Sequence, residues 1–153
     1  MYIGTQDLLK QYDAYLLEHG YQIEELVNLA SDALLNHFTK YNRFAILIGP
    51  GNNGADGYSL GLKLEKLRKH VIYYYSGDIG KVSQANRYYR DQCEENHLIY
   101  VDEDNINTIN WNDYDCIVDG LFGFGLNSAP RGMYKIIIES IMNHYNGVKN
   151  EIF

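Results

Sequence analysis

The nine residues from Gly49 to Gly57 combine four glycines with two asparagines and one aspartate, directly after the apolar run Phe44–Ile48. Glycine lets a backbone approach a ligand closely. N–H groups at the start of a following helix suit an anion such as phosphate. The two Asn amides and Asp56 add donors and acceptors that a plain turn does not need. We therefore favour a ligand-binding loop over a Gly/Asn-rich connection without a ligand.

The spacing of these glycines does not by itself identify a ligand. The loop is not a Walker A loop, because no Gly-Lys-Ser/Thr follows it. Gly49, Gly51 and Gly54 match the pattern Gly-x-Gly-x-x-Gly, but that spacing alone is weak evidence for a dinucleotide site.

A second glycine-bearing loop runs from Asp119 to Gly132. A carboxylate at the end of a buried strand is costly unless it is paired, hydrogen-bonded or bound to a cation. We favour such a role for Asp119 over the capping of the next turn. Gly123 and Gly125 free the backbone to line a ligand. Arg131 is equally compatible with a phosphate contact and with a solvated charge.

The apolar periodicity predicts two helices followed by alternating strands and helices. This alternation predicts an α/β fold with a mostly parallel sheet, in which the loops after the first and fourth strands line one crevice. The expected helices are Thr5–His19, Ile23–Leu34, Ser59 to about Lys69, Val82–Asn96 and Met133–Tyr145. The expected strands are Phe44–Ile48, Val71–Tyr75, Leu98–Val101 and Tyr114–Asp119, with Val148–Phe153 as the opening of a fifth.

Length and charge limit the class of protein. The 153 residues can bury a real core, and we treat 1–153 as a single domain. A net charge of −7 argues against nonspecific binding to nucleic acid. It does not exclude a phosphate ligand, because backbone dipoles can bind one on an acidic protein. We see neither a signal peptide nor an apolar run of membrane-spanning length, so no membrane association is expected.

The cysteines and histidines show no metal-ligand spacing. The two cysteines, Cys93 and Cys116, are too few for a zinc site or a disulfide scaffold. We expect reduced thiols, a core position for Cys116 and a cytoplasmic protein. The five histidines fit surface positions better than a metal site. A β-strand explains Tyr73-Tyr74-Tyr75 more simply than base stacking does.

Two stretches are more specific when they are taken together. They are Gly51-Asn52-Asn53-Gly54-Ala55-Asp56-Gly57 and Val118-Asp119-Gly120-Leu121-Phe122-Gly123-Phe124-Gly125-Leu126. In this order they resemble the two signatures of the YjeF N-terminal domain family, the NAD(P)H-hydrate epimerases. Glu25-Leu26-Val27-Asn28-Leu29-Ala30 is similar to the family's Leu-Met-Glu-x-Ala-Gly helix. The resemblance covers essentially the whole chain.

The resemblance implies a Rossmann-like three-layer α/β/α fold, often a homodimer, that interconverts the R and S epimers of hydrated NADH and NADPH. This reaction repairs damaged cofactor so that a stereospecific dehydratase can act. The resemblance also implies a potassium ion that Asn53 and Asp119 would help to hold, and hard cations prefer such oxygen ligands. Asp56 is the candidate for proton transfer at the hydrated nicotinamide carbon. The implied substrate contacts are Asn52, Asn53, Gly54, Ala55, Asp56, Gly123, Phe124, Gly125, Leu126, Asn127, Ser128 and Ala129.

The chain also departs from the family's pattern. Ala55 replaces the usual second Gly and Phe124 the usual Thr of Gly-Thr-Gly, while Asn28 and Ser31 stand where Glu and Gly are common. The family's later Asp-x-Pro-Ser-Gly motif, a further source of substrate and cation contacts, is absent. We therefore expect a domain whose sheet is incomplete at its C-terminal end. The alternative to an epimerase is a noncatalytic nucleotide-binding or dimerisation module of the same fold, or an inactive fragment.

Overall fold

The computed structural model describes residues 25, 31–32, 35–120 and 132–146. Residues 35–38 are helical and lead into the first strand. The elements that follow are β1 (Arg43–Ile48), α3 (Asn52–Lys66), β2 (His70–Tyr75), η1 (Ile79–Lys81), α4 (Gln84–Arg90), η2 (Glu95–His97), β3 (Leu98–Tyr100), η3 (Ile106–Thr108), η4 (Trp111–Asp113), β4 (Cys116–Gly120) and α5 (Gly132–His144).

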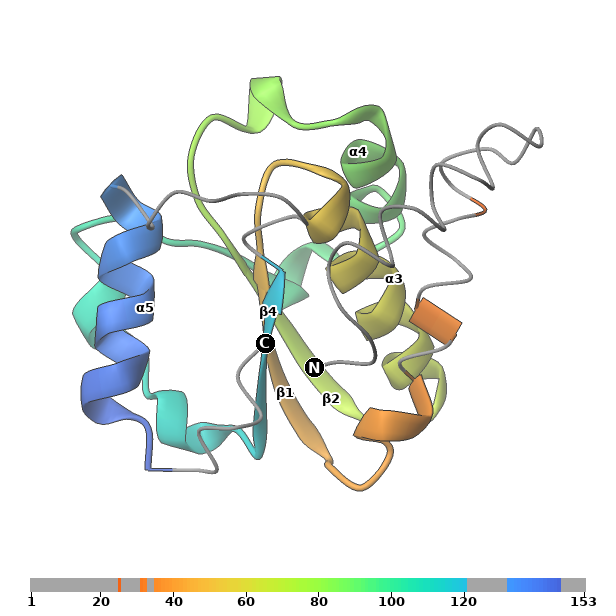
Figure 1. Ribbon diagram of the computed structural model, residues 1–153, viewed down its shortest axis with the longest axis horizontal. Coiled ribbons are helices and arrows are strands. Elements are labelled where there is room, and N and C mark those ends of the chain that lie inside the picture. Colours follow the sequence, from red (N-terminus) through yellow and green to blue (C-terminus); the bar gives the residue numbers. More distant parts are fainter. Residues whose placement is uncertain (1–24, 26–30, 33–34, 121–131, 147–153) are drawn as a thin grey trace, which may run out of the picture.

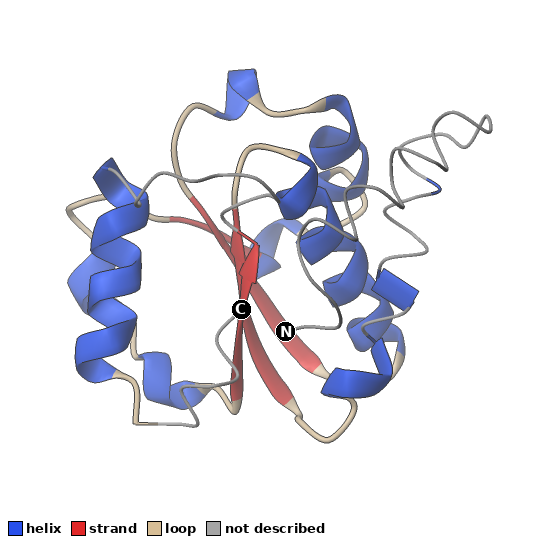
Figure 2. Ribbon diagram, viewed as in Figure 1, coloured by secondary structure: helices blue, strands red, loops and turns tan. Residues whose placement is uncertain are grey.

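The four strands form one parallel sheet in the order β3-β2-β1-β4. Strand β1 lies in the middle, with Ile48 opposite Tyr75 of β2 on one side and opposite Gly120 of β4 on the other. Helices cover both faces of the sheet, α3 and α4 on one side and α5 on the other (Figure 1). The expected α/β fold with a parallel sheet is confirmed (Figure 2).

Alternation along the central strand divides the core into two layers. Side chains at every second position of a strand point to the same face. Phe44, Ile46 and Ile48 belong to the cluster that α3 and α4 cover. Ala45 and Leu47 belong to the cluster on the α5 side, which includes residues of that helix. Burial of apolar surface on both faces holds the three layers together.

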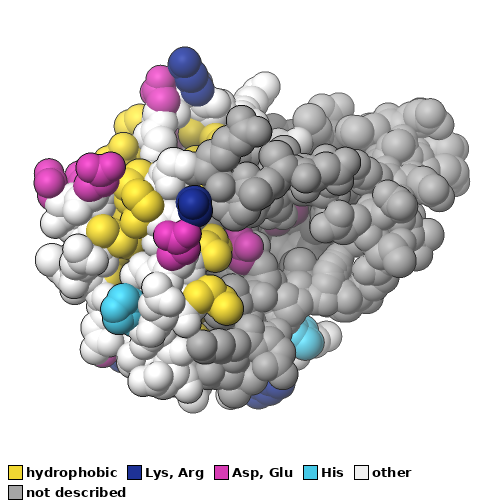
Figure 3. All heavy atoms as spheres, turned by 60° about the vertical axis from the view of Figure 1, so that its left-hand side comes forward, with side chains coloured by type: hydrophobic (Ala, Val, Ile, Leu, Met, Phe, Trp, Pro, Cys, Tyr) yellow, Lys and Arg dark blue, Asp and Glu magenta, His cyan; other side chains and the backbone are white. Residues whose placement is uncertain are grey.

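Helix α5 covers its face of the sheet through one side only. Ile137 and Ile141 are fully buried, and the indole N–H of Trp111 donates to the Ser140 hydroxyl at 3.0 Å. On the outer side, Met142 is 48% exposed. Figure 3 shows hydrophobic side chains gathered in a band over this face of the molecule. The helix therefore leaves apolar surface open among the residues that the structure describes.

Helix α3 begins earlier than the sequence pattern predicts. We expected a loop as far as Gly57, but the helix starts at Asn52, so the loop proper is only Gly49–Gly51. A Cβ at Gly57 would lie 2.8 Å from the Ile48 side chain. This glycine therefore serves close packing of helix against strand, which is one established use of a glycine after a strand.

Helix α4 and strand β4 also differ from the expected ranges. The expected helix Val82–Asn96 is shorter, because the Cys93 N–H bonds to the Arg90 carbonyl in a tight turn that ends it. The fourth strand begins at Cys116 rather than Tyr114. Just before it, the Asp115 carboxylate accepts hydrogen bonds from the main-chain N–H groups of Asn42 and Arg43 at 3.0 and 3.1 Å.

The structure confirms two expectations about core residues, and three expected elements fall in segments that it does not describe. Cys116 is fully buried, as expected. Tyr73 and Tyr74 are buried on opposite faces of β2, which confirms the strand interpretation of the tyrosine run. The helix expected at Thr5–His19, most of the second helix and the strand expected at Val148–Phe153 lie outside the described residues.

The described helices include none with the length and apolar character that crossing a bilayer requires.

Replacing Gly61 by alanine should test the packing of α3 on the sheet. A Cβ there would overlap the buried ring of Tyr73. We expect Gly61→Ala to lower the free energy of unfolding by about 1–3 kcal/mol, although alanine is the better helix former by about 1 kcal/mol. Urea denaturation measures the change. The comparison variant is Gly51→Ala. Nothing lies within 4 Å of a Cβ there, so we expect only the N-cap preference for glycine over alanine, roughly 1 kcal/mol or less. Equal stability of Gly61→Ala and the wild type would contradict this packing.

Candidate functional site

The two glycine-bearing segments leave the sheet at the same edge. Leu47 lies opposite Asp119, and Ile48 lies opposite Gly120. The Gly49 N–H donates to the Gly120 carbonyl at 2.8 Å, which extends the pairing into the first loop. Chain connections run from β1 to β2 on one side, whereas β4 pairs on the other. Ligands of open α/β sheets bind at such a reversal of strand order.

The end of β4 also touches the start of α3. A Cβ at Gly120 would lie 2.6 Å from the Leu47 carbonyl oxygen and 3.3 Å from the Asn53 carbonyl oxygen. Both contacts are with main chain, which cannot swing aside as a side chain can. Only glycine therefore allows strand and helix to approach this closely.

The first turn of α3 faces this edge of the sheet. Gly51 is the N-cap residue and, as a glycine, has no side chain that could cap the helix. The first turn contains no acidic residue, and the Ala55 N–H makes a helical bond to the Gly51 carbonyl at 3.3 Å. Amide N–H groups of a first turn have no partner within their helix, and together with the helix dipole they favour an anion.

The opposite side of the loop is held by α4. The Asn86 side-chain amide donates to the Gly49 carbonyl at 2.7 Å and to the Gly51 carbonyl at 3.2 Å. Asn86 is 1% exposed. No sequence motif points to Asn86. A serine such as Ser83 is a typical N-cap residue, and it does cap α4. A helix that begins there has Asn86 in its first turn, on the buried side.

The expected contacts on the first loop lie on the first turns of α3 with different exposure. Asn52 is exposed, Asn53 and Asp56 are half-buried, and Gly54 and Ala55 are buried. The Ala55 side chain packs in the hydrophobic core. A ligand can therefore meet Asn52, Asn53 and Asp56 at the surface, whereas Gly54 and Ala55 are buried as whole residues.

Asp119 lies half-buried at the end of β4. Since it pairs with Leu47, alternation places its side chain on the α5 face of the sheet. Arg131 and the expected contacts of the second loop lie outside the described residues; these contacts are Gly123, Phe124, Gly125, Leu126, Asn127, Ser128 and Ala129.

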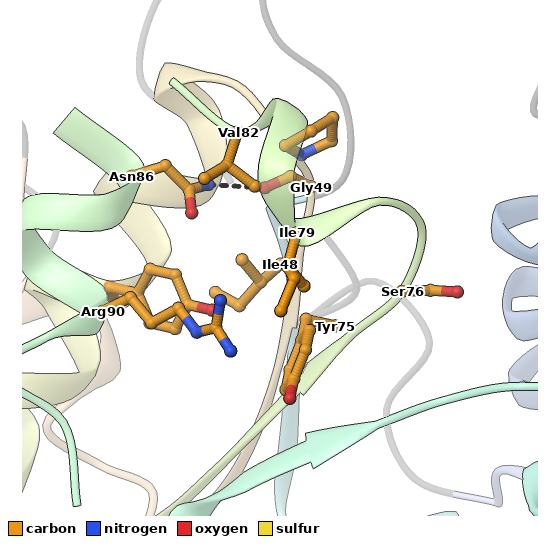
Figure 4. Close-up of a pocket in the computed structure, with 10 residues that line it drawn as sticks. Ile48, Gly49, Tyr75, Ser76, Ile79, Val82, Asn86 and Arg90 are labelled. Carbon is orange, nitrogen blue, oxygen red and sulfur yellow. Dashed lines mark hydrogen bonds between the residues drawn. The ribbon is translucent and has the colours of Figure 1, made fainter. Parts of the chain in front are cut away.

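A small hollow lies between the first loop and α4, lined by Ile48, Gly49, Tyr75, Asn86 and Arg90 among others (Figure 4). It has room for about one water molecule. The Arg90 guanidinium lies 4.7 Å from the centre of the Tyr75 ring. Burial raises the pKa of the Tyr58 hydroxyl, and the charge of Arg90 opposes that rise only in part. The hollow is thus too small for a nucleotide, and it contains no carboxylate or imidazole to act as a base.

Histidine and cysteine do not form a metal site in the part of the chain that the structure describes. His97 pairs with Glu65 at 3.0 Å, and His37, His70 and His144 are exposed. Burial raises the pKa of Cys93 to about 12, so this thiol is not a nucleophile at neutral pH. His19 lies outside the described residues.

Comparison with known proteins identifies relatives of the chain. A family model described as YjeF-related protein N-terminus matches residues 23–151. A protein of Anaerococcus prevotii named NAD(P)H-hydrate epimerase is 32% identical over 123 residues, which cover 76% of this chain and 56% of that protein. A protein of Entamoeba histolytica with the same name is 27% identical over 155 residues, covering 97% and 65%. The chain therefore spans about half to two thirds of the length of these curated relatives.

The crystal structure of yeast ynu0 has a similar fold. The TM-score is 0.70 at 22% identity, and the similarity covers 95% of this chain and 67% of the yeast chain. At this level of identity the likeness concerns the fold alone.

Replacing Gly120 by alanine should disturb the site at its narrowest point. The added Cβ must push apart the Leu47 carbonyl and the start of α3. We expect the free energy of unfolding to fall by about 1–3 kcal/mol, and the Gly49 amide hydrogen, bonded to the Gly120 carbonyl, to exchange faster. Hydrogen exchange with residue resolution measures this effect. An unchanged Gly49 amide in Gly120→Ala would mean that the two segments do not meet here.

Proposed function

The chain belongs to the family of YjeF-related protein N-termini, and we propose that it acts as an NAD(P)H-hydrate epimerase that interconverts the R and S forms of hydrated NADH and NADPH. Two relatives from distant organisms carry this name, and one matches 97% of the chain. The chain spans only part of each relative.

The geometry at the start of α3 supports the proposal independently of sequence similarity. The first turn of α3 begins at the sheet edge beside the end of β4, where the order of the strands reverses. A dinucleotide carries a pyrophosphate, and backbone amides at a helix start stabilise such an anion. This local donor group matters in a chain with a net charge of −7, since the average charge of the molecule repels the ligand.

The substrate contacts follow the two signature loops. We assign to the first the residues Asn52, Asn53, Gly54, Ala55 and Asp56, where exposed or half-buried Asn amides suit the polar parts of the ligand. We assign to the second Gly123, Phe124, Gly125, Leu126, Asn127, Ser128 and Ala129. A ligand held between the two loops would be fixed from both sides of the β1–β4 junction.

Epimerisation at a carbon that carries a hydroxyl beside a ring nitrogen needs a proton donor and acceptor. The hydroxyl takes up a proton and leaves as water while the ring nitrogen supplies the electron pair. Water then adds to the opposite face and returns a proton. We propose Asp56 for this transfer, because a half-buried carboxylate can give and take back one proton.

The family resemblance also implies a potassium ion, and the nearby donors are of the right kind. The carboxylate of Asp119 and the amide of Asn53 offer oxygen ligands, which a hard cation prefers. The Asn53 main chain lies against Gly120, the neighbour of Asp119. We therefore propose that these two residues help to hold the ion. When bound, it would supply positive charge next to the substrate's phosphates.

We further propose a cytoplasmic homodimer. Both cysteines are free thiols, which suits a reducing compartment. Exposed hydrophobic side chains on the face that Figure 3 shows, with Met142 of α5 at 48% exposure, offer surface that a second copy could cover. Sedimentation equilibrium tests the dimer, and a strictly monomeric chain at micromolar concentration would exclude it.

The activity should be measured on separated epimers. One epimer of hydrated NADH is incubated with the chain, and the epimer ratio is followed by chromatography. We expect faster equilibration than in buffer, and faster equilibration in potassium than in choline. A full-length relative serves as the positive control. Equilibration no faster than in buffer would overturn the proposal, and binding of NADP⁺ without turnover would identify a noncatalytic nucleotide-binding module.

Replacing Asp56 by asparagine should separate binding from proton transfer. Asparagine keeps the shape of the side chain but cannot exchange a proton. We expect kcat to fall by about 10²- to 10⁴-fold, the usual contribution of a general acid or base. Asp91→Asn, at an exposed position just after α4, is the matched control for the loss of one carboxylate. If kcat of Asp56→Asn stays within a few-fold of the control, Asp56 does not transfer the proton.

A further inference from the structure

Asn86 holds the glycine loop from the side opposite to the candidate site. Its side-chain NH₂ group donates to two carbonyls, at 2.7 Å to Gly49 and 3.2 Å to Gly51. The side chain is 1% exposed and points from α4 toward the loop (Figure 4). Such a buried amide is costly unless it is hydrogen-bonded. Here both donated hydrogen bonds go to carbonyls of one short loop.

The carbonyl between these two is bound by the main chain at the N-cap of α4. The Ser83 N–H donates to the Pro50 carbonyl at 2.8 Å. The Ser83 hydroxyl in turn accepts from the Asn86 N–H at 3.1 Å, which fixes the first turn of α4. All three carbonyls of Gly49–Gly51 therefore accept hydrogen bonds from the start of α4.

This arrangement decides where the amide N–H groups of the loop point. In a trans peptide the C=O and the following N–H point in opposite directions, and the described chain has no cis peptide bond. The Pro50 carbonyl is bound by Ser83, and the Gly51 carbonyl by Asn86 together with the Ala55 N–H of α3. The N–H groups of Gly51 and Asn52 therefore point away from Ser83 and Asn86. The remaining peptide, between Gly49 and Pro50, has no N–H to aim.

The first turn of α3 packs closely against the Asn86 side chain. A Cβ at Gly54 would overlap the Gly49 carbonyl and would lie 2.6 Å from Nδ2 of Asn86. The first turn of α3 is thus pressed against the same amide that binds the loop. Aspartate in place of Asn86 has the same shape but no N–H donor when ionised, and it would repel both carbonyls.

We propose that Asn86 is a positioning residue for dinucleotide binding, which sets the direction of the Gly51 and Asn52 N–H groups toward the phosphates of the substrate. The inference rests on the proposed function for its substrate. It adds a residue that does not touch the ligand and lies outside both signature loops.

The test is Asn86→Asp, with kcat and KM for hydrated NADH and the Kd of NADP⁺ by calorimetry. We expect KM and Kd to rise by about 10- to 100-fold, the usual effect of losing buried hydrogen bonds that orient a binding group, while kcat changes less. A merely structural residue would lower the active fraction and the calorimetric stoichiometry and leave KM and Kd unchanged. The control is Gln84→Ala, an exposed residue on the same helix.

A second variant covers the case in which Asn86→Asp does not fold. Asn86→Ala removes both hydrogen bonds to the loop without adding a charge and should weaken NADP⁺ binding in the same way. KM and Kd within twofold of the wild type in the folded variants would overturn the proposal. If the wild type is inactive but binds NADP⁺, and Asn86→Asp binds it more weakly, the epimerase proposal is wrong and the positioning role of Asn86 stands. A wild type that binds no NADP⁺ would end both.

Discussion

The candidate site depends on two close approaches that only glycine permits. At Gly120 the end of β4 lies against the carbonyls of Leu47 and Asn53, and at Gly54 the first turn of α3 lies against Gly49 and Asn86. Side chains at these two positions would separate strand from helix and helix from loop. Because both contacts exist, the start of α3, the end of β4 and the start of α4 converge on a loop of three residues.

This convergence gives the loop two different sides. The carbonyls face α4 and are satisfied there, while the first-turn amides of α3 face the edge of the sheet where β1 and β4 end. Peptide geometry makes each side a consequence of the other. An acidic chain can in this way present a local group of N–H donors to an anionic ligand, and two relatives of the chain are named for a dinucleotide substrate.

The sequence predicted the parts of the fold that depend on hydrophobic runs and glycine-rich connections. Phe44–Ile48 and Val71–Tyr75 are strands because their apolar side chains fill two core layers. The structure adds that β4 pairs directly with β1. The start of α3 was misplaced, because Gly54 and Gly57 serve helix packing here and not a turn. Asn86 was missed, because its importance depends on carbonyls more than thirty residues away in sequence.

Mapping of the bound dinucleotide on the backbone amides tests the central claim most directly. In a titration with hydrated NADH followed by ¹H–¹⁵N NMR, we expect the largest shifts at Gly51, Asn52 and Gly120. Arg43 and His70, which pair at the opposite edge of the sheet where β1 and β2 begin, should not shift. Saturable shifts centred at that opposite edge, with the Gly51 and Asn52 amides unmoved, would contradict the assignment of the site.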